Sequence, residues 1–256
     1  MRNKYFIVLA VIVAIMLMSI PAAAETSSSP ESSWQFDFTP YLWLAGIDGD
    51  VRIGRFSSGG AEASITDIFQ DLNGAFMGTF EVHKGRWGIL FDAIYFDISG
   101  TAETPDRAIG NINTELSMGM YSLAGTYRLV EKPLALDLVA GARYATVSAD
   151  LVVEPGKYPN ILEGRSVSDS MNWWDGFVGM RGLIPLSKRW SLLGYAELGA
   201  GGSNFTFQGI AGVNFQVAKH FIIKGGYRYL MIDVEDNLFV YDVQIGGPYL
   251  GLGIVF

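Results

Sequence analysis

The feature that most constrains this chain is an alternation of apolar and polar residues that recurs from residue 34 to the C-terminus. The clearest stretch, 134–151, sets Leu136, Leu138, Ala140, Ala142 and Tyr144 against Asp137, Val139, Gly141, Arg143 and Ala145. Successive side chains of a β-strand point to opposite faces, so the pattern predicts a strand with one apolar face. Hydrophobic residues make up 50% of the chain, yet after the N-terminal segment charges interrupt every apolar run before it could form a spanning helix.

The same alternation predicts ten strands, at 34–47, 75–83, 87–98, 113–129, 134–151, 173–184, 189–201, 205–217, 221–232 and 240–256. Connections of a few residues alternate with longer ones at 48–74, 99–112, 152–172 and 233–239, and only 202–204 is short where a long one is expected. Short turns at one end and long loops at the other are typical of outer-membrane barrels.

A closed barrel is the one non-helical structure that satisfies every backbone polar group in hydrocarbon. We therefore predict an all-β, up-and-down antiparallel transmembrane β-barrel of about ten strands, with eight or twelve as alternatives. The competing interpretation is a soluble secreted sandwich or barrel, which would bury its apolar face and would not need aromatics near so many strand ends.

The N-terminus predicts export from the cytoplasm. Arg2 and Lys4 precede an apolar run over 5–20, and small residues follow at 21–24. This pattern indicates a signal peptide, 1–24, cleaved near Ala24; a retained membrane anchor is the alternative. The mature chain would then have a flexible lead-in, 25–33, a barrel, 34–256, and both termini in the periplasm.

Charge and cysteine content exclude several classes of partner. Removing the predicted signal peptide lowers the net charge from −8 to about −10, because Arg2 and Lys4 leave with it and no acidic residue does. Nucleic acid is therefore not an expected partner. The chain has no cysteine, which excludes disulfides and thiolate metal sites.

The C-terminal strand carries a second signal. Leu250, Leu252, Ile254 and Phe256 alternate down to a terminal phenylalanine, which looks like the signal that the barrel-assembly machinery reads on its clients. Upstream, Phe239, Tyr241, Val243 and Ile245 form an apolar set of the opposite parity. The switch at 246–248, together with Pro40 in the first strand, predicts a bulged and locally weak seam where the barrel closes.

Three stretches, PYLWLAGIDGDV (40–51), DGFVGMRGLIPLSKRWSLLGYAELG (175–199) and GGYRYLMIDVEDNLFVYDVQIGGPYLGLGIVF (225–256), carry a resemblance that covers most of the mature chain. They resemble a widespread family of uncharacterised proteobacterial outer-membrane β-barrel proteins, allied in architecture to the OmpA/OmpW-like small barrels. The resemblance implies a barrel surrounded by outer-membrane lipid and lipopolysaccharide. It implies no activity, cofactor or catalytic residue.

Charged residues at inward positions form the candidate site. They are Asp92, Asp137, Arg143, Asp175, Arg181, Glu197, Lys224 and Arg228. The interior of a narrow barrel is just wide enough to be filled by side chains, and an unpaired buried ion costs several kcal/mol. The charges therefore predict a salt-bridged plug that stiffens the barrel; the alternative is a narrow conduit for small solutes.

Candidate catalytic chemistry is sparse. The chain has two histidines, His83 and His220, both predicted at the periplasmic end and neither part of a nucleophile–base motif. We therefore expect a non-enzymatic barrel with a structural or surface-interaction role in the envelope and with no cofactor or metal. A small-solute channel is the first alternative, and a lipid-active enzyme is a weaker one.

The loops offer two further candidates. Residues 64–72 read as a short amphipathic helix in the first long loop, capped by Ser64. Its apolar stripe would pack on the barrel rim or the lumen mouth, with a ligand or another protein as the alternative. Acidic residues cluster at Asp48 and Asp50 and at Asp233, Glu235 and Asp236. They read as solvated loop charge, with divalent-cation binding or bridging to lipopolysaccharide as the alternative.

Overall fold

The computed structural model describes residues 33–53, 56–63, 72–102, 111–153, 166–236 and 239–256. Its strands are β1 (Trp34–Trp43), β2 (Gly46–Ile53), β3 (Phe56–Ala63), β4 (Leu72–Lys84), β5 (Trp87–Ala102), β6 (Ile112–Val130), β7 (Ala135–Val153), β8 (Ser166–Pro185), β9 (Trp190–Gly201), β10 (Phe205–Ala218), β11 (Phe221–Asp236) and β12 (Phe239–Val255). Within these residues, no helix is long and apolar enough to cross a membrane.

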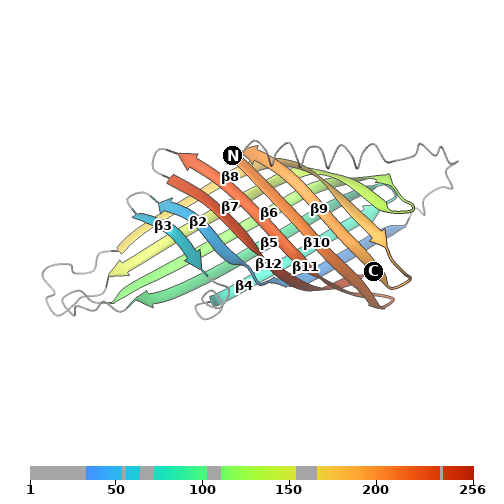
Figure 1. The fold of residues 1–256 in the computed structure, drawn as a ribbon, viewed down its shortest axis with the longest axis horizontal. Coiled ribbons are helices and arrows are strands. Elements are labelled where there is room, and N and C mark those ends of the chain that lie inside the picture. The colour runs from blue at the N-terminus through green and yellow to red at the C-terminus, as the bar shows by residue number, and fades with distance from the viewer. Residues whose placement is uncertain (1–32, 54–55, 64–71, 103–110, 154–165, 237–238) are drawn as a thin grey trace, which may run out of the picture. The chain divides into compact units, whose positions relative to one another are not determined.

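Ten of these strands form the closed antiparallel barrel that the sequence predicts. β1 and β4 to β12 pair in chain order, and β1 returns to pair with β12 (Figure 1). Tight turns join strands at one end, which we call the turn end; at the β4–β5 turn, Gly85 adopts a φ of +59° that an L-residue rarely takes. The longer connections lie at the opposite, loop end, and the short link 202–204 is there as expected.

The first long connection contains more structure than predicted. Within 48–74 the chain forms the hairpin β2–β3, and β2 pairs with the loop-end part of β12. The strands around the predicted connection 152–172 are also longer than expected. β7 extends to Val153, and β8 already begins at Ser166. Leu72 begins β4, and the rest of the predicted helix lies outside the described residues, as do the predicted signal peptide and most of the lead-in.

The prediction of a bulge in the closing seam is wrong. β12 pairs with β1 and then with β2 in one unbroken register, from Val255 opposite Asp37 to Phe239 opposite Ile53. Ladder pairs are instead absent at positions 39–40 and 44–45, beside Pro40 and opposite Pro248. Proline has no N–H to donate, so the ladder loses a bond at each proline without a shift in register, while the Leu44 N–H still donates to the Pro248 carbonyl at 2.9 Å.

The outer surface divides into two zones. Over the turn-end half of the barrel, a belt of exposed apolar side chains faces outward, and it includes Trp34, Leu42, Phe80, Trp87, Phe91, Leu123, Leu138, Trp174, Trp190, Phe221, Tyr227 and Leu250. We call this the belt half. Nearer the loop end many outward positions are polar, as at Ser117, Ser148, Ser170, Asp242 and Gln244, although Val152 is also exposed there.

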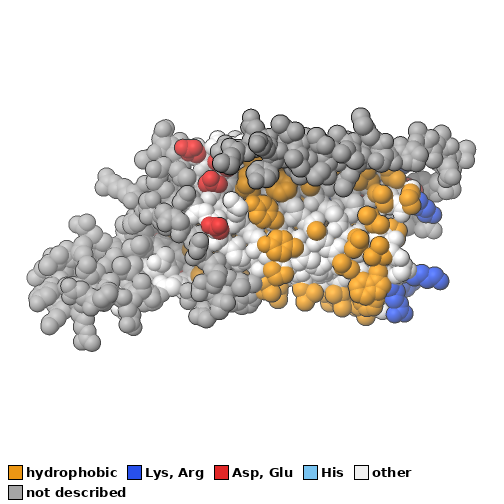
Figure 2. Space-filling view, viewed as in Figure 1, with side chains coloured by type: hydrophobic (Ala, Val, Ile, Leu, Met, Phe, Trp, Pro, Cys, Tyr) orange, Lys and Arg blue, Asp and Glu red, His pale blue; other side chains and the backbone are white. Residues whose placement is uncertain are grey.

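Figure 2 shows the same division on one face, with Lys and Arg at the turn end, hydrophobic side chains in the middle and acidic side chains toward the loop end. We call the remaining part of the barrel, nearer the loop end, the loop half. An apolar band flanked by aromatic girdles is what a membrane barrel presents to lipid. Strands of 19 and 20 residues in β6, β7 and β8 exceed the roughly 9–11 residues that cross a bilayer, so the loop half projects beyond the band.

Candidate functional site

The interior has the opposite polarity to the surface. In the belt half it carries charged side chains, with apolar ones such as Phe177 and Leu193 between them, around a cavity of about 530 Å³ whose lining runs from Arg143 and Arg228 down to the turn residues 187–189. We call it the turn-end cavity. Alternate inward positions on the strands supply its wall, which is why charged residues distant in sequence meet in one space.

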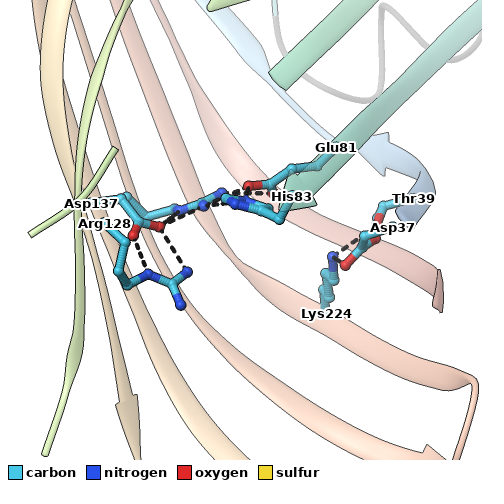
Figure 3. A network of polar contacts seen from close by, with 8 residues as sticks. Asp37, Thr39, Glu81, His83, Arg128, Asp137 and Lys224 are labelled. Atoms are coloured by element: carbon cyan, nitrogen blue, oxygen red, sulfur yellow. Dashed lines mark hydrogen bonds and ion pairs between the residues drawn. The ribbon is translucent and has the colours of Figure 1, made fainter. Parts of the chain in front are cut away.

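One charge network lies in the wall near the turn end (Figure 3). Arg181 on β8 donates to both oxygens of Glu81 on β4, at 2.7 and 2.6 Å, and to Asp137 on β7 at 2.7 Å. Asp137 also accepts from Arg128 on β6, and Glu81 also contacts His83. The chain of alternating charges ties four strands together, which is how buried ions avoid the cost of being unpaired.

A second pair stands on another part of the wall in the same view (Figure 3). The Lys224 ammonium donates to Asp37 at 2.7 Å and to the Thr39 hydroxyl at 2.8 Å, while that hydroxyl donates to the other oxygen of Asp37. Lys224 is on β11 and Asp37 on β1, so this pair spans β12 and braces the closing seam. It reinforces the region where the two prolines interrupt the ladder.

Deeper in the lumen, Arg228 anchors the inner end of the cavity. Its guanidinium donates to Asp92 at 2.7 Å, to the Tyr41 hydroxyl at 2.6 Å and to Gln208 at 2.6 Å. The guanidinium carbon also stands 5.1 Å from the ring centroid of Trp43, within cation–π range. Arg228 is therefore fixed by hydrogen bonds on its edge and by an aromatic face.

Arg143 on β7 is held in a similar way, by an ion pair and hydrogen bonds. Its side chain is 2% exposed and is paired with Glu197, which also accepts from Tyr195. Ser122 accepts from Arg143 at 3.0 Å. With both partners buried, removing either one would leave an uncompensated charge in the lumen.

The eight inward charges predicted from the sequence therefore fall into separate groups rather than one centre. Arg181 joins Asp137, Arg228 joins Asp92, Arg143 joins Glu197, and Lys224 joins a residue outside the eight. Asp175 stands apart from the ion pairs: it accepts from the Trp173 indole at 3.0 Å and from the Ser203 backbone N–H at 2.8 Å. Asp175 therefore secures the 202–204 link.

Several contributing residues are absent from that predicted set: Asp37, Tyr41, Glu81, Arg128, Tyr195 and Gln208. Strand parity places Asp37 and Glu81 inward as clearly as the chosen eight, so completing the pattern on every strand would have found them. Their partners come from strands far apart in sequence, and one sequence gives no signal for those pairings.

Above the charges the lumen contains a cluster of buried apolar side chains, which we call the plug. It consists of Tyr41, Trp43, Ile94, Met118, Met120, Ala145, Val147, Trp173, Leu230, Ile232, Val234, Tyr241, Val243 and Ile245, all buried. Side chains meet across the barrel: the rings of Trp173 and Tyr241 are 5.9 Å apart, and the Tyr241 hydroxyl contacts the Met118 sulfur at 3.6 Å. The predicted outward placement of Tyr241, Val243 and Ile245 is therefore wrong, because above the belt the apolar face points inward.

The two histidines occupy different environments. His83 lies in the cavity wall between Glu81 and Arg181, whereas exposed His220 contacts the Val255 carbonyl at 2.8 Å in the β10–β11 turn. Among the described residues, no group of three or more His, Asp or Glu side chains could hold a metal ion. Asp50 and Asp242 are paired across β2 and β12, and Asp233 pairs with Asp242, so the two predicted acidic clusters are adjacent on the sheet.

Comparison with solved structures identifies the architecture. The outer-membrane protease OmpT of Escherichia coli superimposes with a TM-score of 0.53 and 10% sequence identity, covering 91% of this chain and 99% of OmpT. The chain has the fold of a bacterial outer-membrane β-barrel. At this identity the likeness shows the fold alone.

Two other outer-membrane proteins are also similar. The attachment invasion locus protein Ail of Yersinia pestis, in complex with the heparin analogue sucrose octasulfate, gives a TM-score of 0.37 at 12% identity over 87% of this chain and 98% of Ail. Neisserial surface protein A gives 0.35 at 13% identity over 88% and 99%. No protein-family model matches the chain, and no curated protein matches it either.

Proposed function

We propose that this protein is a non-enzymatic, non-conducting barrel of the bacterial outer membrane, with a structural or surface-interaction role in the envelope. The belt half spans the bilayer and the loop half stands outside it, so that the turn end and both termini are periplasmic. The plug carries the proposal. Fully buried side chains such as Leu230, Val243 and Ile245 leave no room for a hydrated solute above the charged layer.

Planar-bilayer recording tests the closed lumen. The refolded protein should insert without discrete conductance steps, because packed side chains fill the lumen at the level of the plug. Steady openings in the wild-type protein, enlarged by Trp173→Ala and unchanged by Trp174→Ala on the lipid-facing side, would instead identify the narrow channel. Trp174 is 63% exposed and Trp173 is 5% exposed on the same strand, so the two variants form a matched pair.

The surroundings proposed for the barrel rest on its outer surface. Outer-membrane lipid would contact the belt and lipopolysaccharide the strands above it. Leu250, Leu252 and Phe256 are 60%, 42% and 63% exposed on the lipid side of β12, where the assembly machinery could read them. Truncating Phe256 should slow membrane insertion in cells, and protease treatment of intact cells should cleave only the loop-end connections. Cleavage at the turns would reverse the proposed orientation.

The non-enzymatic part of the proposal is supported by the histidines. His83 is held between a carboxylate and a guanidinium, and His220 contacts a backbone carbonyl, so neither activates a hydroxyl nucleophile. Purified protein should leave phospholipid, lipopolysaccharide and unfolded peptide substrates intact. A turnover that His83→Ala or His220→Ala abolishes would make the protein an enzyme. Membership of the OmpA/OmpW-like group likewise remains a proposal that rests on sequence resemblance.

A further inference from the structure

The turn-end cavity is closed inward by the charges and the plug, and its lining reaches the turn end. A volume of about 530 Å³ falls within the range of about 300–1,000 Å³ typical of small-molecule sites. Because the lumen is enclosed by the barrel wall, lipid headgroups around the belt cannot reach it. A ligand would have to be a soluble molecule arriving at the turn end.

The hydrogen-bonding groups of the wall show which ligand chemistry fits. Every oxygen of Asp37, Glu81 and Asp137 already accepts at least one hydrogen bond from a neighbouring side chain. The same holds for both oxygens of Asp92 and Glu197. Each of these carboxylates is also ion-paired with an arginine or lysine, so a cationic ligand would meet negative charge that is already neutralised.

The donors are not occupied to the same degree. Lys224 has three N–H groups and uses two, on Asp37 and Thr39. Arg128 has five and uses two, both on Asp137, and its side chain is 26% exposed. The free N–H groups of these two cations remain available to a ligand, so the wall offers unused donors beside carboxylates that are already ion-paired.

The charges at the mouth of the cavity also favour an anionic ligand. Lys188 and Arg189 lie in the lining, and neither forms an ion pair with any carboxylate in the described part of the chain. The described lining contains seven Lys and Arg side chains against four Asp and Glu. Excess charge of one sign around a low-dielectric concavity concentrates ions of the opposite sign.

One wall atom also lacks a partner. The Asn214 side-chain oxygen is buried without a hydrogen bond, and Asn214 is part of the cavity lining on β10. A buried amide oxygen without a partner needs a hydrogen bond from a water or from a ligand hydroxyl. It lies on the strand next to Lys224, with which Asn214 is directly paired in the ladder.

From these observations we infer that the turn-end cavity binds a small multivalent oxyanion, of the carboxylate or phosphate class and carrying a hydroxyl group. Lys188 and Arg189 draw the anion in, and Arg128 and Lys224 bind it with their unused N–H groups. Hydrogen bonds that involve an ionised group are about twice as strong as neutral ones, so these donors would supply most of the affinity.

The test is calorimetric titration of citrate, a hydroxyl-bearing tricarboxylate, into the refolded barrel in zwitterionic detergent at low salt. We expect one site, weakened by added salt. Lys188→Gln combined with Arg189→Gln should weaken citrate binding about tenfold or more, because the two positive charges that concentrate the anion at the mouth of the cavity are lost. The matched control, Lys84→Gln with Arg86→Gln, removes the same charge from a turn outside the lining. It should change the affinity for citrate by less than about threefold.

Arg128→Gln probes the wall itself. It should also weaken citrate binding, and Arg128→Lys should restore part of it, while both variants keep the heat-resistant migration of a folded barrel. Glucose, which has hydroxyls and no charge, should give no heat. Absence of citrate binding, or equal weakening by the two turn variants, would overturn the inference. Binding in micelles requires neither the proposed orientation nor a closed plug, so this result is independent of the conductance experiment.

Discussion

The belt half and the loop half of this barrel are built on opposite principles. In the belt half the outside is apolar and the inside charged, as at Leu138 and Asp137 on β7. Further along the same strand, Val147 is buried inside while Ser148 faces outward. The strand, its parity and its pairing continue unchanged, so the exchange reflects a change of solvent. In the proposed placement lipid surrounds the belt half and water the loop half, so that each half places its apolar face away from water.

This exchange of the apolar face from outside to inside predicts its largest effect in the plug. Ile245→Asp places a charge where the wild-type side chain is 2% exposed, and should cost about 4 kcal/mol or more of unfolding free energy. Gln244→Asp, the outward neighbour on β12, should change it by less than about 1 kcal/mol. Urea unfolding in lipid vesicles, followed by tryptophan fluorescence, measures both. If Gln244→Asp were the more harmful, Ile245 would face outward after all.

The charged layer of the belt half predicts the next effect. Arg143→Ala leaves the Glu197 carboxylate buried without its partner and should cost about 3–5 kcal/mol. The double variant Arg143→Met with Glu197→Leu removes both charges and should recover most of that loss. The same urea titration decides the matter. A double variant as unstable as the single one would mean that packing, rather than charge pairing, gives Arg143 its importance.

A third prediction locates the border between the halves on one strand. Leu123 is 58% exposed in the middle of the belt on β6, and Leu123→Arg should cost about 2–4 kcal/mol in vesicles. Ser117→Arg, outward on the same strand but toward the loop end, should cost less than about 0.5 kcal/mol. Comparable penalties at both positions would extend the bilayer over the loop half.

Sequence reasoning predicted much of the belt half, because lipid outside and charge inside give a strict alternation. The ten-strand barrel and its turns follow from that alternation. The error at Tyr241, Val243 and Ile245 has a definite cause: apolar residues of either parity look lipid-facing when one polarity rule is applied to a whole strand. The β2–β3 hairpin was missed because Gly, Ser and Asp in 46–63 resemble loop composition. Ion-pair partners such as Glu81 and Arg181 depend on a closed geometry that no local pattern encodes.

The smallest predicted effect concerns the seam, where the two halves also differ. In the loop half, β12 pairs with β2 at eight consecutive positions, 239–246. In the belt half, the pairing of β12 with β1 is interrupted beside Pro40, whose ring nitrogen cannot donate to β12. Pro40→Val supplies the missing N–H donor, and the new hydrogen bond should add about 0.5–1.5 kcal/mol to the free energy of unfolding. Loss of proline also gives the unfolded chain more conformational freedom, which should lower that free energy by about 0.4–1 kcal/mol.

The net change in stability from Pro40→Val should therefore be under about 1 kcal/mol, and amide hydrogen exchange is the sharper measurement. Phe38 and Ile254, the pair beside the gap whose backbone N–H groups point across the seam, should exchange more slowly in the variant, and the new amide at position 40 should itself be protected. Leu42→Val, on the same outward face and seam, adds no donor and should leave those rates unchanged. Equal exchange in all three proteins would mean that the Lys224–Asp37 pair, and not the ladder, already limits opening of the seam in the belt half.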